Sequence, residues 1–153
     1  MPEVNLAAWN HFLESHPNVH LLQMGEWGEL KKYFGWKPVR IVLNNEIGCQ
    51  ILFRRLPLGL TLGYMPKPVF SDQLSVIGDQ FWKEVDSICK KNHAVFLKIE
   101  PDEWDYESPD TWHVTLRASP QNIQPPRTIT IDIKDSEELI LAQPRGLVEA
   151  GND

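Results

Sequence analysis

The chain has 153 residues, 42% of them hydrophobic and 24% charged, which is enough to bury one core without disulfides or metal ions. Its formal net charge of −6 and its lack of a long Lys/Arg run argue against DNA as a partner. Cys49 and Cys89 form no CxxC motif, so a zinc ribbon or a redox centre is excluded and two buried thiols are expected.

No signal-peptide pattern opens the sequence, and no apolar run has the length that spans a bilayer. We therefore predict a cytoplasmic protein with no membrane span.

Two helices are predicted first. Asn5 can cap a helix that ends before Pro17, and its apolar residues share one face at helical spacing. These residues are Leu6, Trp9, Phe12 and Leu13. A second, short amphipathic helix carries Trp27, Leu30 and Phe34 on one stripe, and Gly35 ends it.

Three strands are expected next. From Trp36 the apolar residues alternate with period two, and Asn44 with Asn45 favours a hairpin turn. The alternating residues are Val39, Ile41 and Leu43, then Ile47, Cys49, Ile51 and Phe53. Residues 60–64 predict a third strand, which Pro66 and Pro68 end.

The longest helix is predicted from about Ser71 or Asp72 to Ile88. It leads into the continuous apolar run 94–97, which is typical of a central strand covered on both faces. Further strands are expected at 114–116 and 128–133, and a last helix from Ser136. The prediction is an α+β (mixed α/β) fold of about six strands and four helices.

Few residues indicate a catalytic or binding role by their type and spacing alone. Glu100 stands out because it follows the run 94–99 directly, at a strand end where open sheets place their ligands. A strand-end cap or a salt bridge is an equally good interpretation of Glu100. The acidic stretch 100–110 lacks the ligand spacing and glycine of an EF-hand, so no metal site is predicted. His93 and His113 have no nucleophile beside them and are expected to be surface or packed residues.

Four segments together resemble the successive signatures of the Fem family (FemABX) of peptidoglycan aminoacyltransferases. They are LLQMGEWGELKKYFGWKPVRI at 21–41, LGYMPKPVF at 62–70, AVFLKIEPD at 94–102 and NIQPPRTITIDI at 122–133. The resemblance covers residues 9–143 and implies an acetyltransferase-like (GNAT-like) lobe, the first of two in such proteins. It further implies transfer of an amino acid from aminoacyl-tRNA to an amine on the stem peptide of a peptidoglycan precursor.

The resemblance also assigns site residues. Lys31 matches a lysine that helps to hold the precursor's diphosphate, although an exposed helix lysine explains it equally well. Glu100 matches an acidic position proposed to engage or deprotonate the attacking amine. Tyr64 and Lys67 match a strand-end motif that lines the acceptor groove. The resemblance implies no cofactor beyond aminoacyl-tRNA as the donor substrate.

This sequence departs from the family pattern in two places. The motif YMPKPV lacks the glycine that usually stands between the lysine and the proline, which should alter the turn. After residue 143 the family's basic helix is replaced by PRGLVEAGND, where Pro144 would break a helix. We expect a lobe over 1–143, a poorly ordered tail over 144–153, and a half that is inactive or weakly active without its second lobe.

Two alternatives stay open. One is a non-catalytic module that binds the precursor or a partner chain, for which an exposed apolar patch would be a sign. The other is a small acetyl-coenzyme A-dependent N-acyltransferase, although no glycine-rich phosphate-binding turn follows a predicted strand. Because the second lobe is missing, a second chain that completes the cleft is a further candidate partner.

Overall fold

The computed structural model describes residues 2–69, 79–100, 119 and 123. The chain divides into two compact units, residues 1–116 and 117–153, and every described helix and strand belongs to the first. The predicted strands at 114–116 and 128–133, the helix from Ser136 and the boundary at residue 143 lie outside the described residues.

The described part of the chain forms five strands and three α-helices. The strands are β1 (Glu3–Val4), β2 (Trp36–Leu43), β3 (Ile47–Arg55), β4 (Thr61–Pro66) and β5 (Ala94–Glu100). The helices are α1 (Leu6–Glu14), α2 (Gly25–Tyr33) and α3 (Asp79–Lys91), with the 3-10 turns η1 (Leu21–Gln23) and η2 (Pro57–Gly59). The predicted α+β class with a mixed sheet is confirmed. No α-helix in the described ranges has the length and apolarity needed to cross a membrane.

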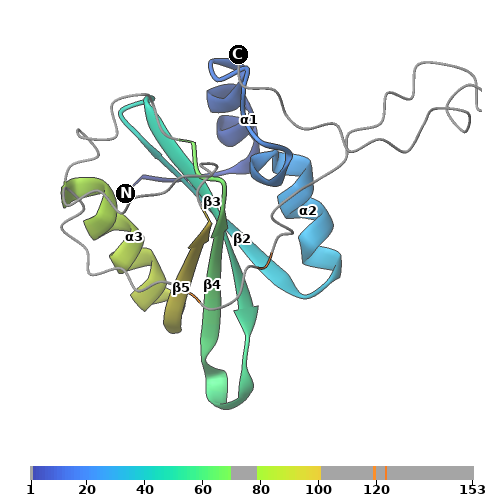
Figure 1. The fold of residues 1–153 in the computed structure, drawn as a ribbon, viewed down its shortest axis with the longest axis vertical. Coiled ribbons are helices and arrows are strands. Elements are labelled where there is room, and N and C mark those ends of the chain that lie inside the picture. The colour runs from blue at the N-terminus through green and yellow to red at the C-terminus, as the bar shows by residue number, and fades with distance from the viewer. Residues whose placement is uncertain (1, 70–78, 101–118, 120–122, 124–153) are drawn as a thin grey trace, which may run out of the picture. The chain divides into compact units, whose positions relative to one another are not determined.

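The strands form one sheet in the order β1-β2-β3-β4-β5 (Figure 1). β1, β2, β3 and β4 pair antiparallel with one another in that order. β5 pairs parallel to β4, after the chain has crossed back through α3. The hairpin turn is at Asn44 and Asn45, as predicted, and both adopt positive φ angles of 54° and 59°. Asparagine tolerates this left-handed conformation better than most residues.

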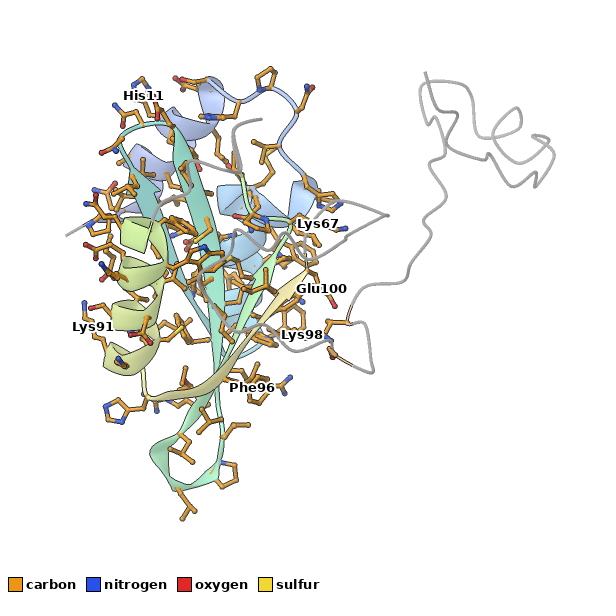
Figure 2. The ribbon with its side chains drawn as sticks, turned by 60° about the vertical axis from the view of Figure 1, so that its left-hand side comes forward. His11, Lys67, Lys91, Phe96, Lys98 and Glu100 are labelled. Atoms are coloured by element: carbon orange, nitrogen blue, oxygen red, sulfur yellow. The ribbon has the colours of Figure 1, made fainter. Side chains whose placement is uncertain are left out.

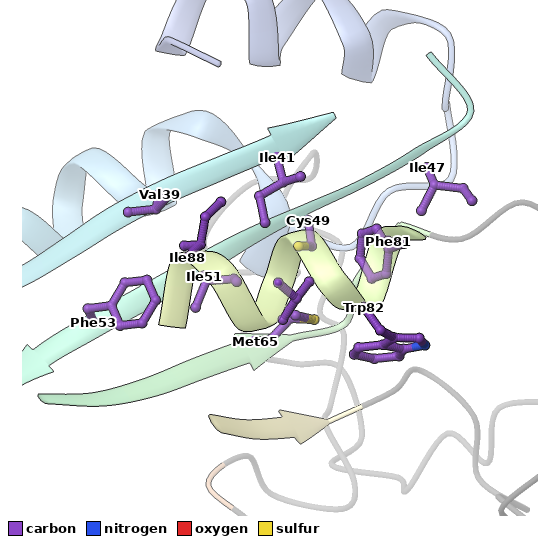
Figure 3. Close-up of a cluster of buried hydrophobic side chains, with 11 residues drawn as sticks. Val39, Ile41, Ile47, Cys49, Ile51, Phe53, Met65, Phe81, Trp82 and Ile88 are labelled. Atoms are coloured by element: carbon purple, nitrogen blue, oxygen red, sulfur yellow. The ribbon is translucent and has the colours of Figure 1, made fainter. Parts of the chain in front are cut away.

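Helices cover both faces of β2 and β3. On one face α3 packs against alternate strand residues in the main core (Figure 3). This core contains Val39, Ile41, Ile47, Cys49, Ile51, Phe53, Met65, Phe81, Trp82, Val85 and Ile88. The opposite face carries the intervening residues, with Val42 packed against the α1 cluster of Trp9 and Phe12. Successive residues of β2 and β3 therefore face opposite sides of the sheet, as the period-two pattern predicts.

Helix α1 confirms its predicted cap. The Asn5 side chain accepts a hydrogen bond from the Ala8 N–H at 2.9 Å, and the helix ends at Glu14, before Pro17. Trp9 is fully buried, and its indole N–H donates to the Gln23 carbonyl at 2.9 Å. This bond fixes η1 against α1.

In the predicted apolar stripe of α2, Trp27 is half-buried and the other two residues are exposed. Leu30 and Phe34 are 46% and 65% exposed, whereas the buried residues of α2 are Gly25 and Gly28. The sheet opposite α2 presents the long polar side chains of Arg40 and Gln50, which leave no room for a second layer of side chains. Glycines let the helix backbone approach the sheet, and Leu30 is left facing outward.

The expectation that β5 is covered on both faces is wrong at its start. Its central place in the sheet stays a prediction, because the strands expected at 114–116 and 128–133 lie outside the described residues. β5 is the last strand in the sheet order, and Val95 and Phe96 are 52% and 55% exposed. A short apolar run does not by itself distinguish a doubly covered strand from one with an exposed end.

Gly28→Ala tests the close approach of α2. A Cβ at this position would lie 2.1 Å from Gln50 Oε1 and 2.7 Å from Arg40 Nη2. We expect the free energy of unfolding to fall by about 1–3 kcal/mol, because overpacking outweighs the better helix propensity of alanine. Urea denaturation measures this, with the exposed Leu30→Ala as the control on the same helix. A higher free energy of unfolding for Gly28→Ala would contradict the close approach of α2 to Gln50 and Arg40.

Candidate functional site

The parallel pairing of β4 and β5 brings three ionisable side chains together. Pro66 pairs with Glu100 and Tyr64 with Lys98, at the carboxyl ends of both strands. The Tyr64 hydroxyl donates to Glu100 Oε2 at 2.6 Å, and Lys98 Nζ lies 3.6 Å from Glu100 Oε1. The side chains of Lys98 and Glu100 are only 14% and 11% exposed. The result is a largely buried carboxylate held between a phenol and an ammonium group.

Lys67 joins this group through its backbone. Its N–H donates to the Glu100 carbonyl at 2.7 Å, and two residues later Val69 pairs with Gly48 of β3. Lys67 adopts φ 42°, in the left-handed region that favours glycine. The motif that lacks the usual glycine therefore makes its turn with the lysine itself, and the backbone of a candidate site residue is strained.

A buried amide holds the end of β4 in place. Gln23, fully buried, accepts from the Gln50 N–H at 2.6 Å through Oε1, and its Nε2 donates to the Pro66 carbonyl. The pairing of β3 with β4 runs only from Arg55 with Thr61 to Leu52 with Tyr64. Gln23 thus supplies the hydrogen bonds that the sheet lacks beyond that point.

The polar contacts continue from Gln50 beneath α2. Gln50 Oε1 accepts from Arg40 Nε at 2.8 Å, and Arg40 Nη2 lies 2.9 Å from Glu29 Oε1. Glu29 also accepts from Lys32 at 2.5 Å. The hydrogen bond from Lys32 and that from Arg40 lower the pKa of the Glu29 carboxyl, against the opposing effect of burial. Arg40, although buried, therefore keeps its charge paired.

Lys31 lies apart from this network, on the outer side of α2. Its Nζ lies 4.6 Å from the centroid of the Trp27 ring, a cation–π contact. Stacking on a rigid indole orients the ammonium group while leaving its N–H donors available to an anion. Of the four predicted site residues, the structure brings Tyr64, Lys67 and Glu100 together and places Lys31 on a different element.

Sequence reasoning missed Lys98 and Gln23. Lys98 stands two residues before Glu100, so strand alternation already puts both on one face. Gln23 had no such signal, because a loop glutamine gives no indication that it will bridge two strands.

Among the described residues, the two cysteines and His93 lie outside this group of contacts. Burial raises the pKa of the Cys89 thiol to about 11, with a smaller effect of Asp86, and burial raises that of Cys49 as well. Exposed His93 occupies the turn before β5 with φ 57°, and His113 lies outside the described residues. Within the described ranges no three His, Cys, Asp or Glu side chains cluster as metal ligands would.

Known proteins resemble this chain over its larger part. It is 31% identical over 113 residues to a lipid II:glycine glycyltransferase of Staphylococcus haemolyticus, and 35% identical over 110 residues to that of Staphylococcus aureus. Each match covers 67% of this chain and 26% of the relative. The crystal structure of FemX matches with a TM-score of 0.57 and 30% identity, over 67% of this chain and 28% of FemX.

The chain belongs to the Fem family. The predicted resemblance is confirmed, and this Fem-family chain spans about a quarter of the length of the curated relatives it matches. No protein-family model matches the sequence.

Gln23→Leu tests the amide bridge of this Fem-family site. It keeps the side-chain volume but leaves the Gln50 N–H and the Pro66 carbonyl buried without their partner. We expect the free energy of unfolding to fall by about 2–4 kcal/mol, since each unpaired buried group costs about 1–3 kcal/mol. Chemical denaturation measures this, and Gln80→Leu on the exposed surface of α3 is the matched control. Equal free energies of unfolding of the two variants would show that the Gln23 side chain does not hold the end of β4.

Proposed function

We propose that this chain carries the acceptor side of an aminoacyl transfer reaction in peptidoglycan synthesis. The relatives are named lipid II:glycine glycyltransferases, and the proposed acceptor here is an amine on the stem peptide of such a precursor. The observation that carries the proposal is the Glu100 carboxylate held by Tyr64 and Lys98 where β4 and β5 end. A cytoplasmic location fits this function and remains a prediction.

In the proposed reaction the stem-peptide amine attacks the ester carbon of aminoacyl-tRNA. An amide bond forms, the ester C–O bond breaks, and the tRNA hydroxyl leaves with a proton. The attacking amine must lose a proton, and Glu100 is the carboxylate proposed to accept it. Tyr64 and Lys98 act as positioning residues, because their contacts hold one orientation of the carboxylate.

Lys31 is proposed to bind the precursor's diphosphate. Lysine stabilises phosphate by charge-assisted hydrogen bonds, and Trp27 holds this ammonium group in place. Glu100 and Lys31 would then engage two parts of one extended ligand, its peptide amine and its diphosphate. The left-handed backbone at Lys67 supports a role of this turn in lining the acceptor groove.

Binding of the precursor is the first measurement. In calorimetric titration with the nucleotide-linked pentapeptide precursor we expect saturable binding that weakens as salt rises. Lys31→Ala should weaken it about tenfold, the loss of roughly one charge-assisted hydrogen bond. Lys32→Ala, the neighbouring lysine paired with Glu29, is the control and should bind nearly as the wild type. Absence of binding by a well-folded chain, or equal effects of both variants, would refute the role of Lys31.

Glu100→Gln separates a functional carboxylate from a structural one. Glutamine keeps an oxygen acceptor for Tyr64, so we expect the free energy of unfolding to change by less than about 1 kcal/mol. Precursor binding should weaken about tenfold, because the amine loses its anionic partner. Glu84→Gln on α3 is the control. A large loss of stability in Glu100→Gln, with the affinity for the precursor unchanged, would make Glu100 a structural residue.

A further inference from the structure

Exposed apolar side chains concentrate at the end of the sheet opposite Glu100. This basal end consists of three segments, residues 31–37, 54–61 and 90–96. Its exposed large apolar residues are Tyr33 (89%), Phe34 (65%), Leu58 (95%), Leu60 (38%), Val95 (52%) and Phe96 (55%). Only Leu21, Leu30 and Ile123 are large, apolar and exposed elsewhere among the described residues.

Strand pairing makes the three segments one continuous surface. Trp36 pairs with Arg54, Arg55 with Thr61, and Thr61 with Ala94. Lys37 Nζ also donates to Asn92 Oδ1 at 2.8 Å, which links the first segment to the third. Figure 2 shows Phe96 at one end of β5 and Glu100 beside Lys67 at the other.

The basal end is strongly basic in an acidic protein. Its three segments hold three, two and two Lys or Arg residues and no Asp or Glu, although the whole chain has 21 acidic and 15 basic residues. The seven are Lys31, Lys32, Lys37, Arg54, Arg55, Lys90 and Lys91. Lys32, Lys90 and Lys91 pair with carboxylates of other segments. Within the described ranges the remaining four have no carboxylate partner, so the surface keeps a positive charge.

The tip of this surface projects an aliphatic side chain. Leu58, in η2, has φ 64°, a left-handed conformation that leucine rarely adopts, and its side chain is almost wholly in water. Both the strain and the exposure are unfavourable for the free protein. An apolar environment at the tip would offset the second cost.

We propose that the basal end docks on an anionic lipid membrane surface. Lys and Arg near anionic headgroups contribute about 1 kcal/mol each, and apolar or aromatic side chains enter the interface beneath them. Charge complementarity favours this occupant over a second copy of the chain, whose basal end would repel its like. The aliphatic Leu58, Leu60 and Val95 favour it over RNA, which binds stacking aromatic platforms.

The proposal extends the proposed function without depending on it. β5 runs from Ala94 at the basal end to Glu100, six steps of about 3.3 Å, so the carboxylate would stand roughly 20 Å from the membrane-facing end. Lys31, in the last turn of α2, would lie at the basal end, where a lipid-linked diphosphate leaves the bilayer.

Vesicle co-sedimentation tests the proposal in the absence of any precursor, so its outcome is independent of the Glu100 site. The probes are phosphatidylcholine vesicles with and without phosphatidylglycerol. We expect binding to the anionic vesicles that weakens with salt. Arg54→Gln/Arg55→Gln should reduce the partition coefficient about 25-fold, about fivefold for each charge. Lys83→Gln, an exposed lysine of α3 outside the basal end, is the charge control.

Leu58→Asn tests the apolar tip, because asparagine tolerates the left-handed backbone and the fold should be kept. We expect a loss of several-fold in partitioning, against no change for the exposed Leu21→Asn outside the basal end. Equal binding to neutral and anionic vesicles, equal effects of the two leucine variants, or binding to tRNA but not to vesicles would each overturn the proposal.

Discussion

The buried amide of Gln23 is the interaction on which the arrangement of the site depends. Where β3 and β4 stop pairing, the Gln50 N–H and the Pro66 carbonyl would otherwise be buried without partners. Burying either group unpaired is costly, so the two hydrogen bonds of Gln23 hold η1 against the sheet at the end of β4. The segment that leads to Lys67 and contacts the Glu100 carbonyl starts from this fixed point. Gln23 thereby anchors the end of β4, beside which β5 ends.

Polar packing beneath α2 inverts the usual orientation of an amphipathic helix. Arg40 is satisfied by Gln50, Gly25 and Glu29, and the glycines of α2 admit these contacts. Leu30 and Phe34 therefore stay exposed, and the half-buried Trp27 carries Lys31 over its ring. The polar contacts beneath α2 stabilise the lobe. They also leave apolar side chains, which usually fill a core, on a surface that can contact ligands.

Local sequence patterns predicted most of the described fold. The features that they did not predict depend on contacts between residues far apart in the sequence. The Asn5 cap, the alternating hairpin and the turn at Asn44 depend on neighbouring residues, and each is confirmed. The orientation of α2 depends on what the sheet presents to it, which periodicity alone does not contain. Family resemblance pointed to Tyr64, Lys67 and Glu100, and the structure places them in contact; their roles stay predictions. Gln23 and Lys98 act through contacts that only the assembled strands reveal.

The parallel junction of β4 and β5 also bears on how the protein folds. The hairpin β2–β3 forms from adjacent residues, whereas Tyr64 and Glu100 are 36 residues apart and meet only after α3 has crossed the sheet. Contacts of large sequence separation carry a loop-closure cost and tend to form late. The hydrogen bond between Tyr64 and Glu100 can therefore form only once β4, α3 and β5 are all in place, which makes it a reporter of complete folding.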